Sequence, residues 1–198
     1  MNLPNLLTLS RIAFLFIIVA LLYMPVTGAA TGALVLFIFA ALTDWLDGYL
    51  ARKRNQISDF GKLMDALADK ILMVGIFVAF LAMPDFLPWW CIFLVLLIIG
   101  REFLITGLRL VAASRSAVLA AERGGKVKTV VQIVAAIIFL LTHALVSDFG
   151  ASGGLEQTLF VLGMISFVLA TLLTVQSGVT YMTKYWYLFQ NQGGGKAE

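Results

Sequence analysis

Four aspartates at helical spacing within one short stretch of the chain are the residues best suited to chemistry. Asp44 and Asp47 are three positions apart, and Asp65 and Asp69 are four apart. Either spacing places both side chains on one face of a helix. A turn between two such helices would bring the pairs together, and like charges at short range repel strongly unless a countercharge is present. The pattern therefore favours a divalent cation held between the two helices.

Carboxylate oxygens are the preferred protein ligands of hard cations such as Mg²⁺ and Mn²⁺. A site with two such ions suits displacement at phosphorus, because the attacking and leaving oxygens both need stabilising. Gly48 and Gly61 lie close to the aspartates and permit close backbone approach. The alternative interpretation is that the aspartates only pair with basic side chains and hold helices together.

The composition indicates an all-α integral membrane protein. Of the 198 residues, 61% are hydrophobic and only 13% are charged, and the mean hydropathy is +0.98. These values lie far from those of soluble domains. Several apolar runs approach the length of about 20 residues that a membrane-spanning helix needs. The single cysteine, Cys91, excludes an intrachain disulfide.

The chain divides into a short interfacial N-terminal helix, within residues 1–11, and six expected transmembrane helices. Helix breakers and polar residues place the six spans near 12–26, 32–49, 61–83, 89–113, 127–145 and 155–179. The first span with its following small residues also resembles a cleaved signal peptide, but the later spans favour a polytopic protein. We expect residues 1–190 to form one domain and residues 191–198 to be a disordered tail.

The basic residues predict the orientation of these spans. Six spans put both termini on one side, and all fourteen Lys and Arg residues then fall in the cytoplasmic half or at its border. The opposite side keeps Asp85, Asp148 and Glu156. We therefore expect the aspartates to face the cytoplasm. The compact chain, without a transit peptide, suggests the inner membrane of a bacterium.

The aspartates belong to a longer pattern, D-x2-D-G-x2-A-R-x8-G-x3-D-x3-D. It is matched at every fixed position by Asp44, Asp47, Gly48, Ala51, Arg52, Gly61, Asp65 and Asp69. This pattern resembles the signature of the CDP-alcohol phosphotransferases, membrane enzymes that join a CDP-activated lipid or alcohol to an acceptor hydroxyl and release CMP. The resemblance implies a six-helix membrane fold, a site near the cytoplasmic interface and a homodimer.

The resemblance also implies roles for individual residues. The metal ligands, for Mg²⁺ or Mn²⁺ and with two ions, would be Asp44, Asp47, Asp65 and Asp69. Asp69 would also be the catalytic general base. The CDP-lipid would be held by Asn5, Thr8, Asp47, Gly48, Ala51 and Arg52. These roles agree with the chemistry, because Arg52 can neutralise a diphosphate and small residues let the nucleotide approach the helix.

Further motifs resemble the phosphatidylglycerophosphate synthase branch of that family. They are Asn5, Thr8 and Arg11 near the N-terminus, Arg101-Glu102-Phe103 with Arg109, and Gly125 to Thr129 with Gln132. This likeness implies CDP-diacylglycerol as donor and glycerol 3-phosphate as acceptor, in a surrounding of membrane lipid and without nucleic acid.

Basic residues independently favour an anionic acceptor. Arg101 and Arg109 are eight apart and so near one helix face, and Lys126 and Lys128 begin the next span. A helix start with lysines is a favourable phosphate site. The alternatives are that the lysines only mark the cytoplasmic boundary and that Arg101 pairs with Glu102 or an aspartate.

Three other functions remain to be separated from this one. Another member of the family would use serine, inositol phosphate or phosphatidylglycerol as acceptor. A divalent-cation or proton-coupled transporter would line a path with the same carboxylates, but the acids cluster at one membrane face. A lipid-binding scaffold would leave the aspartates without a purpose.

Overall fold

The computed structural model describes residues 3–54, 59–114 and 123–186, with side chains for 10–43, 70–112 and 127–186. The described chain is all helical. Its elements are α1 (Leu3–Tyr23), α2 (Ala29–Arg54), α3 (Asp59–Ala82), α4 (Cys91–Ser114), α5 (Arg123–Phe149) and α6 (Gly154–Tyr185). The tail expected at 191–198 lies outside the described residues.

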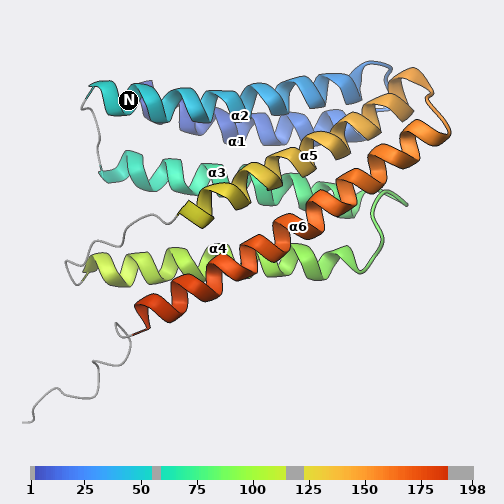
Figure 1. The fold of residues 1–198 in the computed structure, drawn as a ribbon. Coiled ribbons are helices and arrows are strands. Elements are labelled where there is room, and N and C mark those ends of the chain that lie inside the picture. Colours follow the sequence, from blue (N-terminus) through green and yellow to red (C-terminus); the bar gives the residue numbers. More distant parts are fainter. Residues whose placement is uncertain (1–2, 55–58, 115–122, 187–198) are drawn as a thin grey trace, which may run out of the picture.

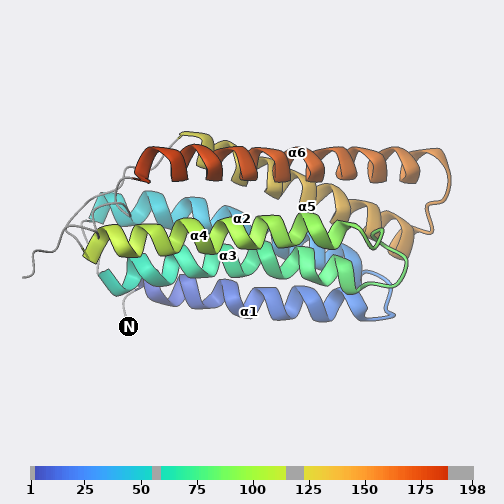
Figure 2. The same ribbon diagram turned by 90° about the horizontal axis from the view of Figure 1, so that it is seen from below.

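Successive helices run in opposite directions along one bundle (Figure 1). The starts of α1, α3 and α5 and the ends of α2, α4 and α6 therefore lie at the same end, on the left of Figures 1 and 2. We call this the basic end, because every Lys and Arg of the described ranges lies near the middle of its helix or toward this end. Asp85, Asp148 and Glu156 lie toward the opposite end.

The first helix differs from the expectation of a separate interfacial segment. Residues 3–11 and the apolar run that follows form the single helix α1. Pro4 stands at the second position of this helix, where the missing N–H costs no hydrogen bond because first-turn amides have no partner within the helix. Arg11 is then carried into the bundle, where its side chain is fully buried.

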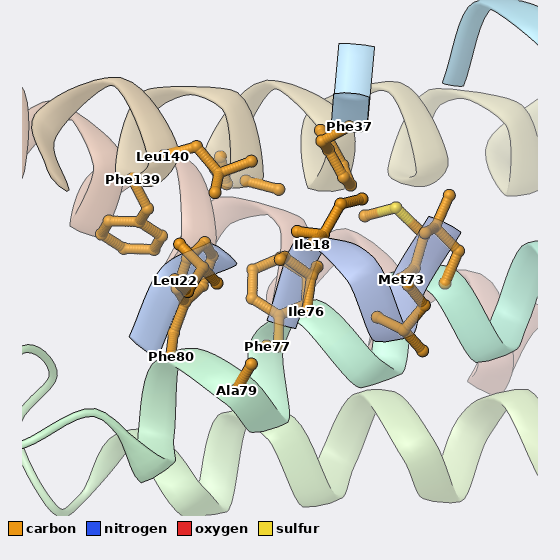
Figure 3. Packing of buried hydrophobic residues seen from close by; sticks show 14 of the residues in the cluster. Ile18, Leu22, Phe37, Met73, Ile76, Phe77, Ala79, Phe80, Phe139 and Leu140 are labelled. Atoms are coloured by element: carbon orange, nitrogen blue, oxygen red, sulfur yellow. The ribbon is translucent and has the colours of Figure 1, made fainter. Parts of the chain in front are cut away.

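The larger hydrophobic cluster lies away from the basic end and combines aliphatic side chains with a group of phenylalanines (Figure 3). Phe77 of α3 stacks on Phe167 of α6 with ring centroids 4.7 Å apart, and Phe80 meets Phe139 of α5 edge to face at 5.6 Å. Ile18 of α1 packs into the same cluster. The second half of α3 is thus anchored in the core, and this anchoring fixes the direction of its first half, which carries Asp65 and Asp69.

The outer surface of the bundle is apolar. Large hydrophobic side chains are exposed on all six described helices, for example Phe16, Val35, Val78, Phe103, Val130 and Leu172. Three helical segments are long and apolar enough to cross a membrane, namely Cys91–Ala112, Val127–Phe149 and Gly154–Tyr185. The described apolar segments of α1, α2 and α3 are shorter, Ser10–Tyr23, Ala29–Thr43 and Lys70–Ala82. Such an outer surface is suited to lipid rather than water.

The turn between α1 and α2 is held by the end of α5. Gly28 adopts a φ of 92°, a left-handed conformation that suits glycine. Its N–H donates to Asp148 Oδ1 at 2.8 Å, while the N–H and the hydroxyl of Thr31 donate to Asp148 Oδ2, each at 2.6 Å. Asp148 therefore caps the start of α2 from another helix.

We expect Asp148→Ala to lower the melting temperature of the protein in detergent. Two amides at the start of α2 would lose their acceptor, and the loss of a helix cap destabilises the helix start. Asp148→Asn keeps one carbonyl oxygen and should recover part of the loss. An unchanged melting temperature in Asp148→Ala would show that the contact contributes nothing.

Candidate functional site

The two aspartate pairs of the signature lie on consecutive helices, in the parts of those helices that are toward the basic end. Asp44 and Asp47 belong to the last third of α2, and Asp65 and Asp69 to the first half of α3. The two helices run antiparallel, with only residues 55–58 between them (Figure 1). The side chains from Asp44 to Asp69, including Gly48, Ala51 and Arg52, lie outside those that the structure describes. The structure shows the expected pair of antiparallel helices, while the meeting of the two aspartate pairs and the ligand geometry stay predictions.

The donor set itself fits a hard divalent cation. Four carboxylates on two consecutive helices supply only oxygen ligands, which suit Mg²⁺ or Mn²⁺ better than softer metals. Among the side chains that the structure describes, no group of three or more His, Cys, Asp and Glu residues competes as a metal site. Asn5 and Thr8 lie in the first turns of α1, whose start is at the same end.

A buried charged cluster joins α4 to α5 beside this region. Arg101 Nη1 donates to Glu102 Oε1 at 3.2 Å, and Lys128 Nζ pairs with the same oxygen. The exposed fractions of the three side chains are only 12% for Arg101, 13% for Glu102 and 6% for Lys128. Charges this poorly solvated are costly unless they are paired. Lys128 is therefore not an exposed boundary residue, and Arg101 does pair with Glu102.

The cluster continues onto α6. Arg101 Nη2 donates to Ser177 Oγ at 3.1 Å, and Ser177 Oγ donates to the Thr174 carbonyl at 2.9 Å. Gln132, one turn beyond Lys128, donates through Nε2 to Thr174 Oγ1 at 3.1 Å. Because Gln132 and Thr174 are both buried, this bond fixes α5 against α6 next to the cluster.

A second connection links the cluster to the helix of Asp65 and Asp69. Thr106 Oγ1 donates to the Glu102 carbonyl at 2.6 Å and is itself contacted by Lys70 Nζ of α3. Lys70 directly follows Asp69 in the chain. The charged cluster and the second aspartate pair therefore belong to one region of the molecule.

The other two basic residues expected near an acceptor are placed differently. Arg109 lies on the exposed surface of α4 and makes no ion pair with any residue whose side chain is described. Lys126 lies in the first turn of α5, at the basic end, with its side chain outside the described set. The structure thus brings Arg101 and Lys128 together without bringing Arg109 to them.

Sequence reasoning missed the part played by α6. Ser177 and Gly178 lie in a long apolar helix, where a single serine commonly bonds its own backbone. The available signal was the small pair Ser177-Gly178, which marks a place where another helix or side chain can approach closely. A Cβ atom built at Gly178 would lie 2.8 Å from Arg101 Cγ, so the arginine stem crosses α6 directly over this glycine.

Known proteins match nearly the whole chain. Residues 1–186 match the model of the CDP-alcohol phosphatidyltransferase family. A protein of Bacillus subtilis named CDP-diacylglycerol–glycerol-3-phosphate 3-phosphatidyltransferase is 39% identical over 197 residues, covering 93% of this chain and 95% of the relative. Proteins of the same name from Rickettsia typhi and Escherichia coli K12 are 35% and 38% identical, covering 91% and 68% of this chain and 94% and 74% of the relatives.

An all-helical bundle with an apolar outer surface and a charged cluster between its helices is typical of a membrane protein. Within that class, the chain belongs to the CDP-alcohol phosphatidyltransferase family. It is therefore an enzyme of that family, and the resemblance inferred from the aspartate signature is confirmed.

Proposed function

We propose that this enzyme transfers the phosphatidyl group of CDP-diacylglycerol to the primary hydroxyl of glycerol 3-phosphate, giving phosphatidylglycerophosphate and CMP. The observation that carries this proposal is the name shared by relatives that align with more than nine-tenths of the chain. The reaction class is supported by the complete aspartate signature on α2 and α3. The anionic acceptor is supported by the buried cluster of Arg101 and Lys128. The product would enter phospholipid synthesis.

The proposal includes a membrane topology. All six helices cross the inner membrane of a bacterium, with the N-terminal turns of α1 near the interface and the basic end facing the cytoplasm. The concentration of Lys and Arg at this end supports the orientation, because cytoplasmic segments of membrane proteins carry an excess of these residues. We also propose that the enzyme is a homodimer surrounded by membrane lipid.

Asp44, Asp47, Asp65 and Asp69 are the proposed ligands of two Mg²⁺ or Mn²⁺ ions. When bound, such ions neutralise the diphosphate and stabilise the attacking and leaving oxygens. Arg52 adds a positive charge for the same diphosphate. Gly48 and Ala51 leave space for the nucleotide beside α2, with Asp47, Asn5 and Thr8 as further contacts to the donor lipid.

Asp69 is the proposed general base. Its carboxylate takes the proton of the acceptor hydroxyl as that oxygen forms a bond to the lipid-side phosphorus. The bond from this phosphorus to the bridging oxygen breaks, and CMP leaves with the bonding electrons. Arg101 and Lys128, with Arg109 and Lys126 nearer the surface, hold the phosphate of glycerol 3-phosphate so that its primary hydroxyl lies toward α3.

The direct test is CMP release by the purified protein in detergent, with identification of the lipid product. We expect release from CDP-diacylglycerol to require both glycerol 3-phosphate and Mg²⁺ or Mn²⁺, and to stop with a chelator. Serine, inositol phosphate and phosphatidylglycerol serve as comparison acceptors. Release with one of these and none with glycerol 3-phosphate would reject the acceptor while keeping the reaction class.

A further inference from the structure

Glu102 is an acidic side chain at the centre of a cluster that is expected to bind an anion. Its Oε1 atom accepts from Arg101 Nη1 at 3.2 Å and pairs with Lys128 Nζ, so one oxygen joins cations from two helices. Two cations brought together in a poorly solvated region repel each other, and a shared carboxylate offsets this repulsion. Glu102 thus holds the two basic groups at a fixed separation.

The direction of Arg101 is set from a third helix. Ser177 Oγ accepts from Nη2 at 3.1 Å, on the other guanidinium nitrogen from the one that meets Glu102. At Gly178 the arginine stem lies against the backbone of α6, where a Cβ would come within 2.8 Å of Cγ. The stem of Arg101 is therefore held at Gly178, and its guanidinium group is held at Ser177 and Glu102.

The backbone of Glu102 is linked to α3 through Thr106. Its carbonyl accepts from Thr106 Oγ1 at 2.6 Å, and Thr106 is in contact with Lys70 of α3. The carboxylate that pairs with Lys128 therefore extends from a stretch of α4 that is tied to the helix of Asp65 and Asp69. Movement of Glu102 relative to that helix is restricted.

We propose that Glu102, supported by Ser177 and Gly178, is a positioning residue that orients Arg101 and Lys128 for the phosphate of the acceptor. This proposal rests on the proposed function, because it deepens the acceptor site assigned there. Cations that already point in the required direction bind an anion with less loss of side-chain freedom. A competing role is that Glu102 occupies the place of the phosphate and must be displaced, in which case its removal would strengthen binding.

The experiment compares Glu102→Ala and Glu102→Gln with the wild-type full-length protein, measuring the KM of each substrate separately. We expect Glu102→Ala to raise the KM for glycerol 3-phosphate about tenfold or more, which corresponds to about 1.4 kcal/mol or more. The KM for CDP-diacylglycerol should change less than about twofold on the same scale. Glu102→Gln, which keeps an acceptor oxygen, should show a smaller rise. Glu156→Ala, at the opposite end, is the matched control.

Two results would overturn the positioning role. A lower KM for glycerol 3-phosphate in Glu102→Gln would identify Glu102 as a competitor of the phosphate. A reduced kcat with both KM values unchanged would identify a purely structural residue. Inorganic phosphate serves as a competitive inhibitor. If the proposal holds, its inhibition constant in Glu102→Ala should rise in parallel with the KM for glycerol 3-phosphate. An unchanged inhibition constant would contradict the proposal.

Gly178→Ala tests the same proposal even if the Glu102 variants fail to fold. The new methyl group displaces the arginine stem, so we expect the KM for glycerol 3-phosphate to rise by roughly three- to tenfold, the scale of one weakened charged hydrogen bond. Gly107→Ala on α4 is its control, because a Cβ there meets no atom within 4 Å. An unchanged KM in Gly178→Ala would contradict the proposal.

Lys128→Met separates failure of this proposal from failure of the proposed function. If Lys128→Met raises the KM for glycerol 3-phosphate and the Glu102 and Gly178 variants do not, only the positioning role is rejected. If Lys128→Met also leaves that KM unchanged, the cluster is not the acceptor site, and the acceptor assignment under the proposed function is rejected with it.

Discussion

Replacing Asp69 by Asn should reduce kcat by roughly 10²- to 10⁴-fold, the contribution that a general base typically makes. The amide cannot take the proton of the acceptor hydroxyl. Asp69 lies in the first half of α3, whose second half is anchored in the aromatic core, so the helix itself should be retained. Binding of CDP-diacylglycerol should survive, because three other carboxylates of the signature and Arg52 remain.

This expectation requires two measurements on the same purified variant, CMP release and equilibrium binding of CDP-diacylglycerol in the presence of Mg²⁺. Asp85→Asn is the matched control, since Asp85 is an exposed aspartate in the turn at the opposite end of the bundle. Loss of lipid binding together with turnover would argue that Asp69 is needed mainly as a metal ligand. Turnover at the wild-type rate would remove the general base from the mechanism.

The sequence was sufficient to predict the helices and their directions. Runs of apolar residues ended by breakers such as Pro84 and Pro88 determine where a spanning helix stops, and the observed α3 and α4 end and begin around that segment. The antiparallel order then follows from the short connections. The start of α1 could not be predicted in the same way, because Asn5, Thr8 and Arg11 are polar residues that suit a separate interfacial helix as well as the first turns of a longer one.

The candidate site was predictable only where its residues are close in sequence. Asp44 to Asp69 form a local pattern, so helical spacing and one turn are enough to bring them to the same end. Arg101 and Ser177 are 76 residues apart, and the contact between them depends on how α4 packs against α6. No periodicity encodes that packing, in which Gly178 leaves room for the stem of Arg101.

The surroundings of Lys128 show why spacing alone is a poor guide to basic residues. Lys126 and Lys128 are both near the start of α5, and either could mark a membrane boundary. The Lys128 side chain is only 6% exposed and pairs with Glu102 of α4, whereas Arg109, on the same helix as Arg101, is exposed. Burial distinguishes a basic residue of the cluster from a basic residue that only marks the membrane boundary. The sequence pattern does not specify burial for a single residue.

Burial of Lys128 also leads to the second large expected effect. We expect Lys128→Met to raise the KM for glycerol 3-phosphate roughly 10- to 100-fold, because a hydrogen bond to a charged group contributes about 1.5–3 kcal/mol. Methionine keeps the apolar stem of the lysine and so preserves most of its packing. Glu102 retains Arg101 as a partner, which limits the cost of leaving its carboxylate poorly solvated.

Steady-state kinetics with each substrate varied in turn would check this expectation, with melting temperature as a measure of folding. The matched control is Lys184→Met, because Lys184 lies near the end of α6, also at the basic end, and stacks over Tyr185 with its Nζ 5.4 Å from the ring centroid. A general loss of positive charge at this end would affect both variants alike. An effect confined to Lys128→Met would instead be local to the cluster of Arg101, Glu102 and Lys128, and an equal rise in the KM of both substrates would count against acceptor binding there.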